Sequence, residues 1–101
     1  MSAFGSAATP LRRARVVVSG DVQGVFFRDT CRRRAIEEGV AGWVRNLRDG
    51  RVEAVFEGGR DPVERLVRWA GHGPRGATVK DIRVYEEEPR AVSGFAILPT
   101  E

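Results

Sequence analysis

The sequence holds one cysteine, one histidine and one lysine among 101 residues, and no long hydrophobic run. With Cys31 alone, no disulfide can form within the chain, and nothing points to an oxidising compartment. One cysteine and one histidine, His72, make a zinc site improbable. No apolar run approaches the ~20 residues that cross a membrane as a helix. These absences predict a cytoplasmic protein with no metal and no membrane partner.

The excess of positive charge is small. The net charge is +3, from 17 Lys and Arg against 14 Asp and Glu, and every cation except Lys80 is an arginine. The sign favours anionic partners, but the size is too small to indicate nucleic acid by itself. A high arginine content can reflect genomic composition as easily as phosphate binding. The charge therefore does not identify a ligand.

Length and composition predict one domain. A chain of 101 residues with 42% hydrophobic residues can bury a single core without disulfides. The first residues, MSAFGSAATPLR, are small and polar and lack the apolar stretch of a signal peptide. We expect residues 1–12 to form a disordered N-terminal extension and residues 13–101 to form the domain.

The first half of the domain predicts a strand, a helix and a hairpin. The run ARVVVSG at 14–20 is typical of a buried strand. Apolar residues then recur every four positions from Phe27 in a helix that ends at Gly39. The pair Asp49–Gly50 indicates a hairpin between strands at 41–48 and 51–58. A two-residue turn and a bulged turn differ by one residue in register, so the sequence does not decide on which face of the sheet Asn46 lies.

The second half predicts a helix and one or two strands. In DPVE, Asp61 is expected as the N-cap, Pro62 at the first helical position and Glu64 in a capping box. ATVKDIRVYEEE follows as a strand, and GFAIL at 94–98 can add a short fifth one. The order βαββαβ predicts an α+β, ferredoxin-like two-layer sandwich, with two helices on one face of an antiparallel sheet.

The loop between the first strand and the first helix is a candidate anion site. Free backbone N–H groups and the positive end of the helix dipole meet there, and Gly20 and Gly24 allow tight turns. Arg28 lies in the first helical turn, where a cation is disfavoured by roughly 0.3–1 kcal/mol unless an anion is bound. An ordinary loop with a solvated Arg28 is about as well supported by these residues alone. No Gly-Lys-Ser/Thr follows, so the loop is not a Walker motif.

Two longer motifs resemble a known family. GDVQGVFFR is similar to the acylphosphatase signature Gly-x-Val-Gln-Gly-Val-x-Phe-Arg, and GVAGWVRNLRDGRVEAVFEG is similar to that family's second motif. The likeness runs from about Arg15 to Leu98. Asp21 is a mild departure, because basic or small residues are more usual there.

The resemblance implies an enzyme that hydrolyses small acyl phosphates to a carboxylate and inorganic phosphate. Arg28 would bind the phosphoryl oxygens, and Asn46 would orient the attacking water. The implied phosphate-binding residues are Asp21, Val22, Gln23, Gly24, Val25, Phe26, Phe27 and Arg28. A carboxylate leaves without protonation, so no metal, cofactor or histidine base is required. We expect a monomer that inorganic phosphate inhibits.

Other interpretations of these residues remain. Asn46 can serve only the turn, His72 is better explained as a surface side chain than as a general base, and Cys31 lies on an apolar helix stripe rather than in a reactive site. An RNA-binding module has the same element order, but the segment RVEAVFEGG offers one aromatic and two glutamates where such modules stack bases. A phosphate-sensing domain without turnover is a third possibility.

Overall fold

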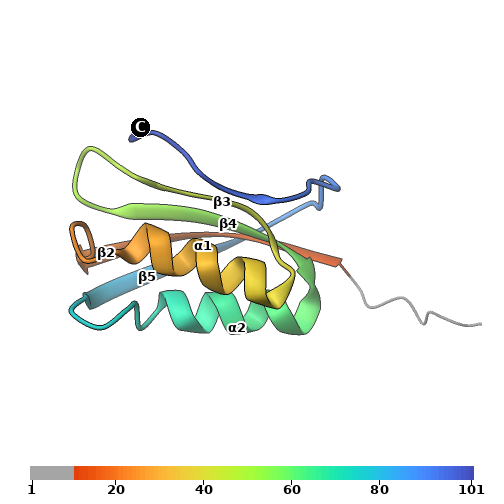
Figure 1. Cartoon of the computed structure of the whole chain (residues 1–101), viewed down its shortest axis with the longest axis horizontal. Helices are drawn as coiled ribbons and strands as arrows, with labels where there is room; N and C mark the ends of the chain where they lie inside the picture. The colour runs from red at the N-terminus through yellow and green to blue at the C-terminus, as the bar shows by residue number, and fades with distance from the viewer. Residues whose placement is uncertain (1–10) are drawn as a thin grey trace, which may run out of the picture.

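The structure, a computed structural model, describes residues 11–101. Figure 1 shows the two helices side by side on one face of the sheet. Along the chain the elements are β2 (Leu11–Asp21), α1 (Phe27–Glu38), β3 (Ala41–Asn46), β4 (Val52–Gly59), α2 (Arg60–Ala70), β5 (Thr78–Glu87) and β6 (Phe95–Ile97).

The sheet has five strands in the order β5-β2-β4-β3-β6. β2 pairs antiparallel with β4 and β5, and β3 pairs antiparallel with β4. The fifth strand exists: β6 lies at the edge and runs parallel to β3, which makes the sheet mixed. The expected ferredoxin-like sandwich of two helices on one face is confirmed.

The first strand begins earlier than expected. Leu11 and Arg12 pair with Gly59 and Gly58 in β4, so these two residues belong to the sheet and not to an extension. The Arg12 guanidinium also bonds the carboxylates of two elements, Glu86 Oε2 at 2.7 Å and Glu64 Oε1 at 2.7 Å. These cross-links fix the start of β2. The rest of the expected extension, residues 1–10, lies outside the described residues.

The core lies between the helices and the sheet. It is formed by inward side chains of the strands, such as Val16, Val44 and Phe56, against the apolar stripes of both helices. Cys31 is fully buried among them, and burial raises the pKa of its thiol. A thiol that stays protonated is a poor nucleophile. The expectation that Cys31 packs in the core is confirmed.

The helix ends agree with the sequence for α1 but not for α2. Gly39 ends α1 in a left-handed conformation, with its N–H bonded to the carbonyls of the last turn. α2 begins at Arg60 with Gly59 as its N-cap, so the prediction of Asp61 as N-cap and Pro62 as the first helical residue is wrong. Strand β4 runs directly into the helix, which leaves no loop for a side-chain cap.

The capping box predicted at Glu64 is also absent. Its carboxylate bonds Arg12 and Arg68 instead of a backbone N–H at the start of α2. Two charged donors hold the carboxylate more strongly than one amide would.

Candidate anion-binding site

The β3–β4 turn fixes the face on which Asn46 lies. Leu47 donates its N–H to Arg51 O at 2.8 Å and accepts from Gly50 N–H at 3.1 Å, which leaves a loop of residues 48–50. Gly50 has φ 97°, as the last residue of such a bulged turn requires. Asn46 lies two residues from the buried Val44 in the same strand, so both side chains face the helices. The open choice of register is therefore resolved in favour of the bulged turn.

The loop between β2 and α1 presents a row of free backbone donors. Within residues 11–101, no backbone N–H from Gln23 to Asp29 donates a hydrogen bond. The first helical bond of α1 is that of Thr30 N–H to Phe26 O, at 3.0 Å. Phe26 is the N-cap residue and provides no side-chain cap. The positive end of α1 is thus available to an anion.

Five of these seven residues line a cavity of about 240 Å³, which we call the anion cavity. The loop after β2 and the β3–β4 turn lie at the same end of the molecule (Figure 1), and residues of that loop and the last residue of β3 line the cavity. The residues that line it are Val22, Gly24, Phe26, Phe27, Arg28, Asp29 and Asn46. The volume suits a tetrahedral phosphoryl group and a neighbouring water, since one water occupies about 30 Å³ in the liquid.

Arg28 and Asn46 reach this cavity from different elements. Arg28 is the second residue of α1, and no ion pair within residues 11–101 involves it. Asn46 Oδ1 is buried and has no hydrogen-bond partner among the described residues. A buried acceptor without a partner is costly in a folded protein. Both side chains are therefore available to a ligand.

Asn46 does not serve the turn, which was the alternative explanation for it. Its backbone pairs with Val52, and its carbonyl accepts the N–H of Glu101 at 3.1 Å, but its side chain bonds no residue of the 47–51 loop in the described structure. The residues that shape the turn are Asp49, which accepts from Arg51 N–H at 3.2 Å, and Gly50.

Gln23 joins the loop between β2 and α1, residues 22–26, which we call the cradle loop, to the β3–β4 hairpin. Its Nε2 donates to Leu47 O at 2.8 Å and to Arg51 O at 2.9 Å, which are the two residues that close the β3–β4 turn. Leu47 follows Asn46 directly, so this clip couples the position of Asn46 to that of the backbone donors. Gln23 therefore connects the two parts of the site without lining the anion cavity itself.

The structure brings only part of the predicted cradle to the cavity. Val22, Gly24, Phe26, Phe27 and Arg28 line it, whereas Asp21, Gln23 and Val25 do not. Asp21 ends β2 in a pair with Thr78, and Val25 packs against the core. Asp29 lines the cavity and was not predicted, although acidic residues are common in a first helical turn.

Gly20 has a different role from the one expected. It lies at the register shift between β2 and β5, and a Cβ there would lie 2.2 Å from Thr78 O. Gly20 therefore permits close contact between two strands, while Gly24, with φ 75°, is the glycine at the cavity.

The histidine considered as a general base lies outside the anion cavity. His72 is exposed in the loop after α2 and does not line the anion cavity. The described residues contain no group of three or more His, Cys, Asp or Glu side chains placed to hold a metal ion. Within the same range, no helix is long and apolar enough to cross a membrane.

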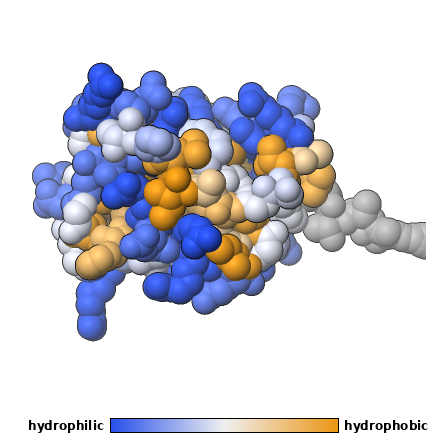
Figure 2. All heavy atoms as spheres, turned by 45° about the horizontal axis from the view of Figure 1, so that its top comes forward, coloured by the Kyte–Doolittle hydropathy of each residue, from blue (hydrophilic) through white to orange (hydrophobic). Residues whose placement is uncertain are grey.

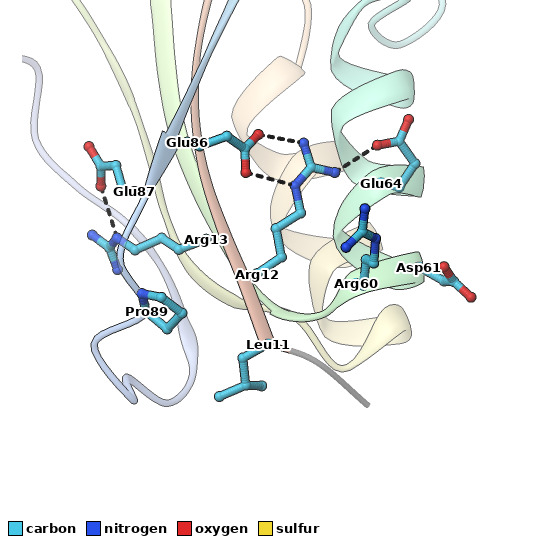
Figure 3. Close-up of a pocket in the computed structure, with 9 residues that line it drawn as sticks. All are labelled: Leu11, Arg12, Arg13, Arg60, Asp61, Glu64, Glu86, Glu87 and Pro89. Carbon is cyan, nitrogen blue, oxygen red and sulfur yellow. Dashed lines mark hydrogen bonds and ion pairs between the residues drawn. The ribbon is translucent and has the colours of Figure 1, made fainter. Parts of the chain in front are cut away.

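Another cavity, of about 640 Å³, lies at the start of β2 (Figure 3) and shares no lining residue with the anion cavity. Five of its seven charged side chains pair with one another: Arg12 bonds Glu64 and Glu86, and Arg13 bonds Glu87. These ion pairs join β2 to α2 and to β5 at the start of β2. We therefore place the candidate site in the smaller cavity.

The outer face of the sheet carries a chain of ion pairs across four strands. Each residue of this series pairs with the next: Arg45, Glu53, Arg15, Glu87, Arg13 and Glu57. Burial alone would raise the pKa of Glu57, but the N–H of Arg90, the guanidinium of Arg13 and the N–H of Val92 lower it below its ordinary value. The central carboxylates are thus already neutralised by arginines of the same chain.

The aromatic rings on that face are also engaged. The guanidinium of Arg15 lies 4.4 Å from the centre of the Tyr85 ring, and that of Arg45 lies 4.8 Å from the centre of the Trp43 ring. On the face shown in Figure 2, hydrophobic residues occur in small groups between hydrophilic ones. RNA-binding domains of this fold need free rings and unpaired cations there. These contacts argue against the RNA-binding alternative.

Fold and site together define an α+β sandwich with an anion cavity at a helix N-terminus. The family model "Acylphosphatase" matches residues 14–97. An acylphosphatase of Rubrobacter xylanophilus is 60% identical over 92 residues, which cover 89% of this chain and 83% of the relative. The structure of an acylphosphatase from Coxiella burnetii has a TM-score of 0.83 and 40% identity, and the match covers 87% of this chain and 93% of that one.

The crystal structure of an acylphosphatase from Bacillus subtilis is similar as well, with a TM-score of 0.81 and 36% identity over 88% of this chain and 99% of that chain. The chain belongs to the acylphosphatase family and is an enzyme. The family expected from the two sequence motifs is confirmed.

Proposed function

We propose that the chain hydrolyses small acyl phosphates to a carboxylate and inorganic phosphate in the anion cavity. The proposal depends on one observation within residues 11–101: free backbone N–H groups, Arg28 without an ion pair and the unsatisfied Oδ1 of Asn46 lie at one small cavity. Family membership supports the same reaction.

In this proposal the phosphoryl group lies against the N-terminus of α1. The N–H groups of the cradle loop and the helix dipole bind its oxygens. Arg28 adds a planar guanidinium that donates two parallel hydrogen bonds to a tetrahedral anion. As the bond to the leaving oxygen lengthens, these fixed donors stabilise the negative charge that develops on the phosphoryl and carboxyl oxygens.

Asn46 orients the attacking water. Its Oδ1 accepts a hydrogen bond from the water, and the amide N–H₂ can donate to a phosphoryl oxygen. The water oxygen forms a bond to phosphorus while the bond between phosphorus and the carboxylate oxygen breaks. The carboxylate leaves with the electron pair, and the proton of the water remains with the phosphate or passes to solvent. An amide cannot act as a base at neutral pH, so Asn46 contributes through these hydrogen bonds and takes no proton from the water.

This donor set predicts hydrolysis that does not depend on a metal ion. Purified protein should hydrolyse acetyl phosphate at the same rate with and without EDTA, because Arg28, Asn46 and the backbone donors make up the proposed site. Release of inorganic phosphate is the measurement, with protein-free acetyl phosphate as the control. Loss of activity with EDTA, restored by a divalent ion, would contradict the mechanism.

The same assay separates turnover from binding alone. Protein that is stabilised by phosphate but releases none from acetyl phosphate would be a phosphate-sensing domain. A cytoplasmic location, a monomeric state and inhibition by inorganic phosphate remain predictions.

A further inference from the structure

A second cavity, of about 410 Å³, adjoins the anion cavity, and the Phe26 side chain lines both. We call it the arginine cavity. Residues of α1 and of the loop that follows α2 line it, and the start of α1 and that loop lie at the same end of the molecule (Figure 1). The residues that line it are Val25, Phe26, Thr30, Arg33, Arg34, Trp69, Gly73, Pro74 and Arg75.

The arginine cavity is lined by three cations and no carboxylate. Within residues 11–101, Arg33, Arg34 and Arg75 take part in no ion pair, whereas the arginines of the outer sheet face are paired with glutamates. The Arg34 guanidinium lies 5.7 Å from the centre of the Trp69 ring. Three unpaired guanidinium groups beside an aromatic wall favour an anionic ligand with a flat apolar body.

Phe26 connects the two cavities. It has φ 60° and ψ 28°, a left-handed conformation that bulky side chains rarely adopt, and its side chain is 77% exposed. Thr30, Arg33 and Arg34 lie on one face of α1, at the three- and four-residue spacing of a helix, and line the arginine cavity together with the N-cap residue Phe26. A ligand extending from the anion cavity past Phe26 would therefore meet the guanidinium groups.

The geometry of displacement at phosphorus also directs the acyl group of the substrate toward the arginine cavity. Displacement at phosphorus places the attacking water and the leaving oxygen on opposite sides. Asn46, which orients the water in the proposed mechanism, lines the anion cavity but not the arginine cavity. The acyl group would then extend away from Asn46, toward α1 and the loop after α2.

We infer that the arginine cavity binds the acyl group of the substrate and selects acyl phosphates whose acyl group carries a second negative charge. The inference rests on the proposed function, because it needs a phosphoryl group in the anion cavity. Phe26 packs against the body of the acyl group, and Arg33, Arg34 and Arg75 attract its distal anion.

The test compares two substrates of one shape, benzoyl phosphate and 4-carboxybenzoyl phosphate. Wild-type protein should show a KM lower by about fivefold for the carboxylated compound at low ionic strength, as expected for exposed ion pairs. The double variant Arg33→Gln/Arg75→Gln should lose this preference and keep its kinetics on benzoyl phosphate, which also shows that it folds. Added salt should weaken the wild-type preference.

A matched control is Arg60→Gln/Arg90→Gln, which removes the same charge from exposed positions that do not line either cavity. This control should retain the preference. Equal KM values of the wild type for both compounds, or an equal loss of preference in the control, would overturn the inference and leave the proposed function standing. Failure to hydrolyse either compound would overturn the proposed function itself, and the inference with it.

Discussion

Arg28→Gln is expected to lower acyl phosphate hydrolysis by about 10³-fold or more, the range seen when a phosphoryl-transfer enzyme loses its arginine. Glutamine keeps much of the side-chain length but removes the charge and the paired donors. The phosphoryl group then loses its clamp, and the developing negative charge loses its stabiliser. The measurement is kcat/KM for acetyl phosphate.

Stability should change in the opposite direction. Arg28 lies in the first turn of α1 and has no ion pair within the described residues, so it carries an electrostatic cost when no anion is bound. In phosphate-free buffer the free energy of unfolding of Arg28→Gln should stay level or rise by up to roughly 1 kcal/mol. The extra stability that added phosphate confers on the wild type should shrink in the variant.

The control for this variant is Arg90→Gln, because Arg90 is exposed and contacts Glu57 through its backbone N–H. It removes the same charge and should leave activity and phosphate stabilisation unchanged. Marked destabilisation of phosphate-free Arg28→Gln would mean that Arg28 is mainly structural. Retained hydrolysis would remove Arg28 from the mechanism.

Asn46→Ala is expected to lower kcat by about 10²-fold or more, the usual cost of removing one positioned polar group from a catalytic site. Phosphate affinity should change far less, because the amide addresses the water more than the bound anion. The kinetic signature is thus a loss in kcat with a nearly constant inhibition constant for phosphate.

The fold should tolerate this substitution. The contacts of Asn46 with Val52 and Glu101 are made by its backbone, and its Oδ1 is unsatisfied among the described residues. Removing a buried acceptor without a partner should leave the free energy of unfolding level or raise it. A variant with normal turnover would remove Asn46 from the mechanism.

The sequence predicted those parts of the site that depend on local chemistry. The helix from Phe27 to Gly39, and with it the place of Arg28 in a first turn, follows from apolar periodicity and a glycine cap. The acylphosphatase motifs identified the family. The face of Asn46 could not be predicted, because it depends on whether the turn at Asp49–Gly50 has two residues or three.

Contacts between segments that are distant in the sequence could not be predicted either. The two hydrogen bonds from Gln23 Nε2 to the carbonyls of Leu47 and Arg51 span 24 and 28 positions of the sequence, and no local pattern indicates them. Gly20 fits beside Thr78 for a similar reason. Asp61 has the sequence pattern of an N-cap, but the direct passage of β4 into α2 overrides that pattern.

The most direct test of the central claim, that an anion binds at the N-terminus of α1, is a titration with inorganic phosphate followed by the backbone amide resonances. The largest shifts should centre on the amides of Gln23 to Arg28, which have no acceptor within the described residues, and should saturate together. Shifts centred on residues 72–76, in the loop after α2, would place the anion elsewhere and contradict the account.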